Sequence, residues 1–488
     1  MQPVYRQIFA QAEAAPGKPA IVAGSRTLTY GGLAEAAGRM ASALVHRHGI
    51  GPGDRVLLSA DADPDFIAAY LAVHAAGAVA APVDPDAGSA RRAEIVERLE
   101  PALAVAGDAA SEVAHTSFAD LAQSTAGPLP DARLPTDAPA DILFTTGSTG
   151  RSKGVVLSHR AIAASTRHIN AFLGTGADAI EVLPLPLGHS FGLGRVRCIL
   201  SLGATLVLTR GLVNPASFLD AVYAHRASGF ASVPSGIAIL LADGGERLRA
   251  LASRIAYVEI GSSPMPLAHK KQLMRLLPAT RICMHYGLTE ASRSAYSSFH
   301  DNRDKLDSIG RPSDGVRMRV VLASGEEAPP GVEGRLEISG EHLMSEYWRD
   351  PTLTARTLTG GWLRTGDLGR RDDDGFFWLA GRESEVINVG GHKVAPREIE
   401  EILLRHPSVA ECACAGMPDP QGLSGEMVCV WLVARPGAAR PGFPELAKML
   451  RAELESYKIP RRFEWIDELP KSASGKILRG RLSAAGGA

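Results

Sequence analysis

The sequence predicts an α/β protein built from more than one domain. Short apolar runs alternate with segments of helical period up to about residue 300, and this alternation is typical of parallel sheets covered by helices. From about Ser308 the chain changes to short strands divided by Gly, Pro and Asp turns, which predicts a small antiparallel or barrel-like unit. A third pattern starts near Gly381 and combines strands with helices. A length of 488 residues fits this division, because domains usually hold about 100–200 residues.

The predicted elements follow the chain in order. Helices are expected over residues 33–44 and 66–76. Buried strands are expected over residues 55–60, 78–82, 103–106, 142–144, 179–184, 205–208, 230–233 and 255–260. The third pattern predicts a helix over 396–405, a strand pair around 409–434 and a helix over 444–456. Residues 107–140, rich in Ala, Asp and Pro, are predicted to form a surface connection.

Residues 66–83 carry no formally charged side chain, and the stretch is therefore a candidate membrane span by length. Half of its residues are Ala or Gly, it contains His74, and it runs into Ala81-Pro-Val-Asp-Pro85, so we interpret it as a buried helix that leads into a core strand. The first residues, Met1-Gln-Pro-Val-Tyr-Arg, lack the pattern of a signal peptide. We therefore expect no membrane span and a cytoplasmic location.

The composition excludes some classes of partner. The chain has 52 Lys plus Arg against 53 Asp plus Glu, and this balance argues against nucleic-acid or anionic-membrane binding through bulk basic charge. Five cysteines are too few and too scattered for a disulfide framework. Cys412 and Cys414 alternate along a predicted strand, so we interpret them as packed thiols rather than a metal pair. The sequence does not determine the oligomeric state.

The strongest local motif is Ile142-Leu-Phe-Thr-Thr-Gly-Ser-Thr-Gly-Arg-Ser-Lys-Gly154, where a buried strand leads into a loop of hydroxyls, glycines and one lysine. Glycines let backbone N–H groups approach phosphate oxygens, hydroxyls add donors or reach a metal, and lysine supplies positive charge. The Walker A pattern requires Gly directly before the Lys, and here Ser152 stands before Lys153. The motif thus predicts a nucleotide-phosphate loop of a different kind.

This loop resembles the phosphate loop of the adenylate-forming superfamily, which contains acyl-CoA synthetases, peptide-synthetase adenylation domains and luciferases. The family pattern is Thr-Ser-Gly-Thr-Thr-Gly-x-Pro-Lys-Gly. The chain departs from it at Thr146, Ser148 and Ser152. The first two departures keep the hydroxyl, and the third replaces a rigid proline by serine.

Further segments match family motifs in family order, from residue 28 to residue 479. They are Leu28-Thr-Tyr-Gly-Gly-Leu33, the segment 72–85, Gly261-Ser-Ser-Pro264, Tyr286-Gly-Leu-Thr-Glu290, Gly361-Trp-Leu-Arg-Thr-Gly-Asp-Leu368, Gly381-Arg382, the segment 391–400 and Pro470-Lys-Ser-Ala-Ser-Gly-Lys-Ile-Leu-Arg479. The resemblance therefore covers nearly the whole chain, and most resembles an acyl-CoA synthetase.

The resemblance implies a specific domain organisation. A large domain over 1–380, with two helix-covered, mostly parallel sheets and the small barrel-like unit, would bind ATP and the acyl substrate. Residues 381–384 would form a hinge, and 385–488 a small mobile α+β domain that carries a catalytic lysine. Many relatives have Asp two residues after the hinge arginine, where this chain has Ser384, so the identity of the hinge pivot stays open.

The resemblance also implies the site residues. Lys476 would bridge the attacking carboxylate and the α-phosphate, Lys153 would bind phosphate, and Glu290 with Thr145 would hold Mg²⁺, for which hard oxygen ligands are suited. Asp367 would bind the ribose hydroxyls and Arg382 the ribose and phosphate side, while Gly390 and Gly391 would line a pantetheine tunnel. The remaining residues expected to contact ATP are Thr146, Gly147, Ser148, Thr149, Gly150, Gly261, Ser262, Ser263, His285, Tyr286, Gly287 and Thr289.

The acyl pocket is less well defined. His189, in Leu-Gly-His-Ser-Phe, would gate the pocket or contact the carboxylate, or it is a structural histidine at a helix start. No aspartate occurs among residues 185–197, which argues against a typical α-amino acid substrate. Arg195, Arg197 and Arg293 would either meet a polar or anionic substrate tail or occupy helical surface positions.

These features predict an AMP-forming acid–thiol ligase. It would use ATP and Mg²⁺ to convert a small carboxylic acid to an acyl-adenylate with release of pyrophosphate, and then pass the acyl group to coenzyme A. One alternative is an adenylation enzyme that loads the phosphopantetheine of an acyl carrier protein. A catalytically inactive nucleotide-binding relative is a more distant alternative. The sequence does not identify the acid.

Overall fold

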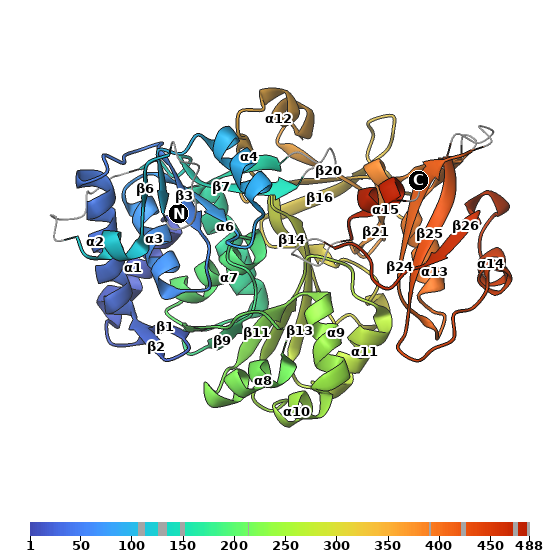
Figure 1. The fold of residues 1–488 in the computed structure, drawn as a ribbon, viewed down its shortest axis with the longest axis horizontal. Coiled ribbons are helices and arrows are strands. Elements are labelled where there is room, and N and C mark those ends of the chain that lie inside the picture. Colours follow the sequence, from blue (N-terminus) through green and yellow to red (C-terminus); the bar gives the residue numbers. More distant parts are fainter. Residues whose placement is uncertain are drawn as a thin grey trace. The chain divides into compact units, whose positions relative to one another are not determined.

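The computed structural model describes residues 1–105, 113–124, 134–146, 152–212, 214–389, 392–420, 426–471 and 477–485, without the side chains of Thr146, Lys393 and residues 483–485. The chain divides into two compact units (Figure 1). The first unit holds Met1–Met318 and Ile338–Leu363, and the second unit holds Arg319–Glu337 and Arg364–Ala488.

A nine-stranded, mostly parallel sheet (sheet A) forms one layer of the first unit. The neighbours from β13 to β1 pair in parallel, and antiparallel pairs occur at both edges. Its order is β15 (Arg311–Pro312), β14 (Ala291–Ser298), β13 (Arg281–Leu288), β12 (Tyr257–Ile260), β11 (Gly229–Ser232), β9 (Ile180–Leu183), β10 (Thr205–Leu208), β1 (Pro19–Ala23) and β2 (Arg26–Thr29). The interior strands are continuous buried runs, as parallel strands covered on both faces require.

A seven-stranded sheet (sheet B) forms the second layer of this unit. Its order is β18 (Glu346–Tyr347), β8 (Ser152–Ser158), β7 (Pro139–Thr146), β4 (Val79–Val83), β3 (Arg55–Ser59), β5 (Leu103–Val105) and β6 (His115–Thr116). The strands from β7 to β6 pair in parallel, whereas β7 and β8 form an antiparallel hairpin and β18 pairs antiparallel with β8. The two parallel sheets that the sequence predicts are therefore present.

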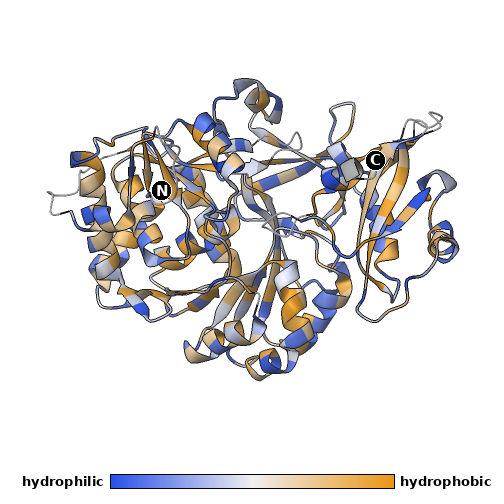
Figure 2. Cartoon of the chain, in the orientation of Figure 1, coloured by the Kyte–Doolittle hydropathy of each residue, from blue (hydrophilic) through white to orange (hydrophobic). Residues whose placement is uncertain are grey.

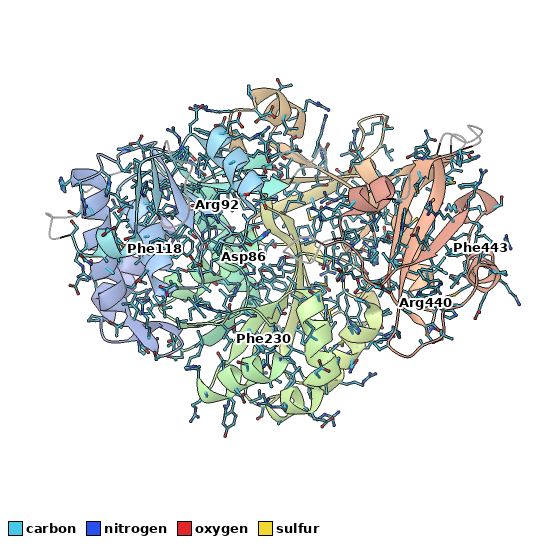
Figure 3. All side chains as sticks on the ribbon, in the orientation of Figure 1. Asp86, Arg92, Phe118, Phe230, Arg440 and Phe443 are labelled. Atoms are coloured by element: carbon cyan, nitrogen blue, oxygen red, sulfur yellow. The ribbon has the colours of Figure 1, made fainter. Side chains whose placement is uncertain are left out.

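Helices cover these sheets. They are α1 (Val4–Ala14), α2 (Tyr30–His46), α3 (Pro64–Ala75), α4 (Ser89–Leu99), α5 (Phe118–Ala122), α6 (His159–Leu173), α7 (Ser190–Ser201), α8 (Pro215–Ala224), α9 (Pro234–Asp243), α10 (Gly245–Ala250), α11 (Leu267–Leu276) and α12 (Pro351–Thr357), with a 3₁₀ turn, η1 (Arg303–Lys305). Helices α8 to α11 lie beside β11 and β13 (Figure 1). In this core Phe230, labelled in Figure 3, packs edge-on against Phe218 with ring centroids 5.3 Å apart.

Two sequence predictions are settled by these helices. Helix α3 from Phe66 onward and β4 are buried, which confirms the interpretation of residues 66–83 as a core helix leading into a strand. Asp63 caps α3 by accepting from the Asp65 N–H, and Pro64 stands at its first turn. Among the described helices, none is both long and apolar enough to cross a membrane. The predicted connection over 107–140 contains β6 and α5, and residues 106–112 and 125–133 lie outside the described part.

A five-stranded sheet corresponds to the turn-rich segment after Ser308. Its order is β16 (Val316–Val321), β17 (Gly334–Gly340), β20 (Trp362–Arg371) and β19 (Leu358–Thr359), and β21 (Phe377–Arg382) pairs antiparallel with β20. Thr365 donates to the Leu336 carbonyl oxygen (2.8 Å) within this sheet. The sequence prediction of a small antiparallel unit is confirmed.

The second unit has its own core. It contains η2 (Glu383–Glu385), β22 (Ile387–Val389), β23 (His392–Val394), α13 (Pro396–Leu403), β24 (Val409–Pro418), β25 (Glu426–Ala434), α14 (Phe443–Arg451), η3 (Ser456–Lys458), β26 (Arg462–Trp465) and α15 (Arg479–Ala485). Strands β24 and β25 are mostly hydrophobic (Figure 2), and Cys412 and Cys414 are buried free thiols, as predicted. The helix expected over 444–456 is shorter and ends at Arg451. Beyond it the chain forms a turn in which the Glu453 and Leu454 N–H groups both donate to the Leu450 carbonyl oxygen.

Candidate active site

The β7–β8 hairpin carries the predicted phosphate loop. Register pairs Thr145 with Lys153 and Thr146 with Ser152, so the first hydroxyl and the lysine of the motif stand directly opposite each other. The hairpin is anchored by buried Ile142 and Leu143 on β7. Residues 147–151, which include the predicted contacts Gly147, Ser148, Thr149 and Gly150, lie outside the described residues.

Tyr347 links Lys153 to Glu290. The ammonium of Lys153 lies over the Tyr347 ring, 5.7 Å from its centroid, and the Tyr347 hydroxyl donates to Glu290 Oε1 (2.7 Å). Burial, followed by the neighbouring Glu290 carboxylate, raises the pKa of Tyr347, so the phenol stays protonated and can donate. The structure thus places the predicted lysine and the predicted carboxylate on either side of one tyrosine, with Thr145 across the hairpin.

Strand β18 sets this geometry. Tyr347 and Glu346 pair with Val155 and Val156 of β8, and the Trp348 N–H donates to the Gly154 carbonyl oxygen (2.7 Å). On the other side, Met344 N–H donates to the Glu290 carbonyl oxygen (2.8 Å). One short segment therefore holds both the phosphate hairpin and the Glu290 turn. Tyr347 was not predicted from the sequence, where its only local signal is an aromatic pair with Trp348.

The N-terminus of α7 borders the Thr289–Glu290 turn. The hydroxyl oxygens of Ser190 and Thr289 lie 3.4 Å apart. His189 precedes the helix at its N-cap position, is exposed, and makes no capping hydrogen bond through its side chain. His189 therefore stands at a helix start, as its structural interpretation expected, with its side chain exposed beside this turn.

The predicted adenine-side residues also lie together. A Cβ at Gly261 would lie only 2.0 Å from His285 Cε1, so the close approach of this ring requires glycine. Nδ1 of His285 lies 3.0 Å from Glu259 Oε1, and burial lowers the pKa of His285 although Glu259 opposes the shift. Tyr286 is buried, with 8% of its surface exposed. Ser262 follows Gly261 with a left-handed φ of +81°, which marks a strained turn at this loop.

Arg195 and Arg293 belong to a closed ionic network under sheet A, and both interpretations offered for them are wrong. Arg195, fully buried, binds Glu181 (Nε to Oε1, 3.0 Å) and lies 3.3 Å from a Glu259 oxygen. Arg293, on β14 and only 2% exposed, donates to Glu259 (3.3 Å) and to the Phe191 carbonyl oxygen (2.9 Å). Although burial alone would raise it, the two guanidinium groups hold the pKa of Glu259 below its usual range. Neither arginine is a surface residue or available to a substrate tail.

Arg197 is likewise buried, on the opposite side of α7. It forms an ion pair with Asp141 of β7 and donates to the Tyr70 hydroxyl (2.9 Å), and His74 Nε2 lies 2.9 Å from Asp141. Arg195 and Arg197 thus bind α7 to sheet A and to sheet B, respectively. The helix lies between the two sheets, and its position fixes the Ser190 end beside Thr289.

Two further predicted residues meet in the second unit. Asp367 on β20 pairs in register with Arg382 on β21, and Arg382 Nε lies 2.8 Å from Asp367 Oδ1. The Asp367 N–H donates to the Thr365 hydroxyl (3.0 Å), which keeps the Thr-Gly-Asp turn closed. Ser384 lies in η2, directly after Arg382 and Glu383. Gly390, Gly391 and Lys476 lie outside the described residues.

The oxygen donors Glu290 and Thr145 suit a hard cation such as Mg²⁺ that is also held by a phosphate. The described residues contain no group of three or more His, Cys, Asp or Glu side chains that could hold a metal on their own.

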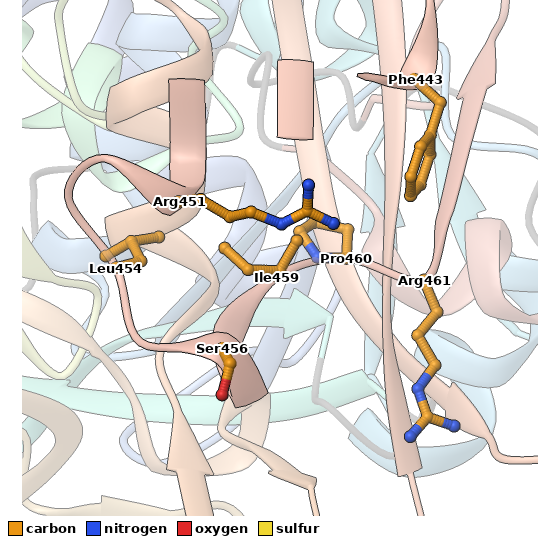
Figure 4. A pocket seen from close by; sticks show the side chains of 7 residues that line it. All are labelled: Phe443, Arg451, Leu454, Ser456, Ile459, Pro460 and Arg461. Atoms are coloured by element: carbon orange, nitrogen blue, oxygen red, sulfur yellow. The ribbon is translucent and has the colours of Figure 1, made fainter. Parts of the chain in front are cut away.

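A hollow of about 550 Å³ opens on the second unit (Figure 4). Its lining consists of Phe443, Arg451, Leu454, Ser456, Ile459, Pro460 and Arg461. None of the motif residues is among them, so the hollow is separate from the predicted chemistry.

Comparison with known proteins gives the same assignment. A family model described as AMP-binding enzyme matches residues 8–348, and one described as AMP-binding enzyme C-terminal domain matches residues 398–476. Sulfoacetate–CoA ligase of Cupriavidus necator is 32% identical over 96% of this chain and 94% of its own length. Fatty acid–[acyl-carrier-protein] ligase ScoC of Streptomyces coeruleorubidus is 30% identical over 96% and 93%, respectively.

Solved structures agree with this result. ATP-bound MatB from Rhodopseudomonas palustris superimposes with a TM-score of 0.90 at 26% identity, covering 99% of both chains. These matches confirm the α/β fold and the adenylate-forming ligase chemistry that the motifs predict. The chain belongs to the AMP-binding enzyme family.

Proposed function

We propose that this chain activates a carboxylic acid with ATP and transfers the acyl group from the acyl-adenylate to the thiol of coenzyme A. The observation that carries the proposal is the group formed by Lys153, Tyr347 and Glu290 opposite Thr145. It presents a cation, a carboxylate and a hydroxyl that are held in place without neutralising one another. Such a set is suited to a nucleotide phosphate and its metal ion.

The adenylation step uses these residues as follows. Lys153 binds the phosphate chain, and Asp367 with Arg382 holds the ribose. Lys476 approaches the attacking carboxylate and the α-phosphate and offsets the charge as two anions come together. Mg²⁺ on Glu290 and Thr145 would neutralise charge on the departing pyrophosphate. His189 borders the carboxylate end of the acid, as its exposed position beside Thr289 supports.

The adenine end of ATP meets the loop 261–263 and the strand end 285–287. Gly261 and His285 are in direct contact, so this part of the pocket has one wall of fixed shape. Tyr286 lies against the base, and Thr289 leads from the base to Glu290. The glycine-rich residues 146–150 supply backbone N–H groups to the phosphates.

We propose the domain organisation of the resembling family for the second step. Residues 1–380 form the large domain, 381–384 the hinge and 385–488 the small domain, which rotates to exchange Lys476 for the Gly390–Gly391 segment. A thiol channel passes these two glycines, which carry no side chains. Ser384 lies in the 3₁₀ turn Glu383–Glu385, which falls between strands β21 and β22, and this irregular connection supports a pivot there.

An experiment can distinguish coenzyme A from a carrier protein as the acyl acceptor. The relatives include a ligase named for each acceptor, and we propose coenzyme A. The purified chain is given a panel of aryl, short and medium acids with MgATP, alone, with coenzyme A, or with a phosphopantetheinylated carrier protein. Mass spectrometry should detect acyl-adenylate in all three reactions and acyl-CoA in the reaction that contains coenzyme A. Thioester on the carrier protein alone would favour the alternative, and ATP binding without any turnover would favour an inactive relative.

The role of Lys476 has its own test. Lys476→Ala should abolish adenylate formation and spare thioester formation from supplied acyl-adenylate, because the residue acts on the first step only. Lys471→Ala is a matched control five residues away in the same motif, since Lys471 is paired with Glu411 (2.6 Å). Equal loss of both half-reactions in Lys476→Ala would contradict the assignment.

A further inference from the structure

Ser152, which precedes Lys153, is held by two side chains of α4 through all of its polar groups. Its N–H donates to Glu94 Oε1 (2.9 Å), and its hydroxyl donates to Glu94 Oε2 (3.0 Å). Its carbonyl oxygen accepts a hydrogen bond from Arg98 Nη1. Only 2% of Ser152 is exposed, so the contacts are shielded from water on that side.

Glu94 and Arg98 form a matched pair one helical turn apart. Arg98 Nε lies 3.7 Å from Glu94 Oε1, and the two side chains are 37% and 30% exposed, respectively. The hydrogen bond from the Ser152 backbone, with smaller contributions from its hydroxyl and from Arg98, lowers the pKa of Glu94. The carboxylate therefore stays ionised and accepts both Ser152 bonds at neutral pH.

The same helix is tied to the segment that carries Tyr347. Trp348 Nε1 donates to the Arg98 carbonyl oxygen (3.1 Å), while the Trp348 N–H donates to the Gly154 carbonyl oxygen (2.7 Å). The start of β8 thus lies between α4 and Trp348. Because successive side chains of a strand point to opposite faces, fixing Ser152 toward α4 turns Lys153 toward Tyr347.

We propose that Glu94 and Arg98 are positioning residues that hold Lys153 in place for phosphate binding. The family pattern has proline where this chain has Ser152, and proline lacks both the N–H and the hydroxyl that Glu94 binds. In this chain three side-chain hydrogen bonds (the clamp) fix the backbone before Lys153, and a proline at position 152 would keep only the one to its carbonyl oxygen. The inference rests on the proposed function, in which Lys153 binds the phosphates of ATP.

A double-mutant cycle tests the clamp. The variants are Glu94→Ala, Ser152→Pro and both together, with Glu97→Ala, an exposed glutamate on the same helix, as the matched control. Calorimetric titration with MgATP in the absence of acid measures the affinity. We expect each single change to weaken binding about tenfold, as loss of charge-assisted hydrogen bonds implies. In the Glu94→Ala background, Ser152→Pro should weaken MgATP binding further by less than about threefold, because the Glu94 carboxylate that binds Ser152 is already absent.

Independent effects that multiply in the double variant, or unchanged ATP affinity in Glu94→Ala, would overturn the proposal. With an acid identified from the panel, KM for ATP should rise in Glu94→Ala while KM for the acid stays constant. A merely structural role of Glu94 would instead lower the yield and Tm of the folded protein and leave both KM values unchanged. Hydrogen exchange of the 152–154 amides, faster in Glu94→Ala than in Glu97→Ala, tests the clamp without ATP. A wild-type chain that binds no MgATP would instead contradict the proposed function.

Discussion

Two groups of charges in the first unit are arranged in opposite ways. Under sheet A, two glutamates and two arginines (Glu181, Glu259, Arg195 and Arg293) are fully buried and pair with one another. At the β8 hairpin, Lys153 and Glu290 contact the same tyrosine without forming an ion pair with each other among the described residues. The first group is electrically complete, whereas the second leaves a cation and a carboxylate to be completed by a ligand.

This difference explains what each group can do. Buried ions lose hydration, and mutual pairing with good geometry is needed to offset that cost, so a closed network contributes fixed geometry rather than reactivity. Here it fixes α7 and therefore the Ser190–Thr289 contact. Tyr347, by contrast, contacts the two opposite charges of the open group, through its ring and through its hydroxyl. The site depends on the closed network for its shape and on the open group for binding.

The largest expected effect follows from opening the closed network. Arg195→Met leaves Glu181 and part of Glu259 as buried carboxylates without their guanidinium partner, and should lower the free energy of unfolding by about 3–5 kcal/mol. Urea denaturation followed by tryptophan fluorescence measures it. Arg249→Met, which removes an exposed arginine paired with Glu246, is the control and should change stability by less than about 0.5 kcal/mol. Equal losses in the two variants would contradict the comparison.

The next effect follows from removing the cation of the open group. Lys153→Met should lower kcat/KM for adenylate formation by about 10²–10³-fold, because a preorganised charge on the phosphates is lost. The free energy of unfolding should stay within about 0.5 kcal/mol of the wild type, since Lys153 contributes no ion pair among the described residues. ATP–pyrophosphate exchange and urea denaturation are measured on the same preparation. A large stability loss with normal exchange would assign Lys153 to the structure instead.

A smaller effect should follow from Tyr347→Phe. The ring under Lys153 is kept, and the hydrogen bond to Glu290 is removed, so the carboxylate loses its orientation. We expect about a tenfold drop in kcat/KM for adenylate formation, equivalent to one charge-assisted hydrogen bond. Tyr223→Phe, at an exposed position, is the matched control. An unchanged rate in Tyr347→Phe would show that Glu290 is positioned by its backbone contacts alone.

The sequence predicted the elements of the two groups unequally. Lys153 and Glu290 stand in local motifs, where residue type and spacing carry the chemistry, and both could be named before the structure was known. Tyr347 could not, because its link to Glu290 joins residues 57 positions apart. Arg195 and Arg197 were misjudged for the same reason. Their partners lie on strands of different sheets, and a helix between two sheets shows no polar face by which its burial could be recognised.

The fold shows the same limit. Strand β10 is a continuous run without charged residues, β12 is an apolar run interrupted by Glu259, and both were predicted within two residues. The order of strands within each sheet is set by packing between distant segments, and the sequence predicted only that the sheets are mostly parallel. Glu94 was not predicted as a functional residue, because a glutamate on an amphipathic helix usually faces solvent.

A third way to bury polar side chains is to keep them uncharged, and such side chains should make the stability of the folded chain sensitive to acid. His168 and His342 are each 2% exposed, and their rings pack edge to face with centroids 5.3 Å apart. Burial, followed for His168 by the neighbouring His342, lowers their pKa values from 6.5 to about 3 and about 4, respectively. The charged side chains of Arg293 and Arg167 also disfavour protonation of His168.

The sign of the pH dependence follows from these depressed values. Below about pH 6.5 the unfolded chain binds protons on both histidines, while the folded chain does not. The free energy of unfolding therefore decreases as the pH decreases, by ~0.8 kcal/mol per histidine from pH 8 to pH 6. The lowered pKa of Glu259 in the closed network keeps that carboxylate ionised in this window, so it adds nothing to the change. His342→Asn should flatten the pH dependence of the urea midpoint, and His115→Asn, at an exposed position, should not. An equally steep pH dependence in His342→Asn would mean that His342 is protonated in the folded chain. The buried histidine pair would then be charged, like the network under sheet A, and not neutral.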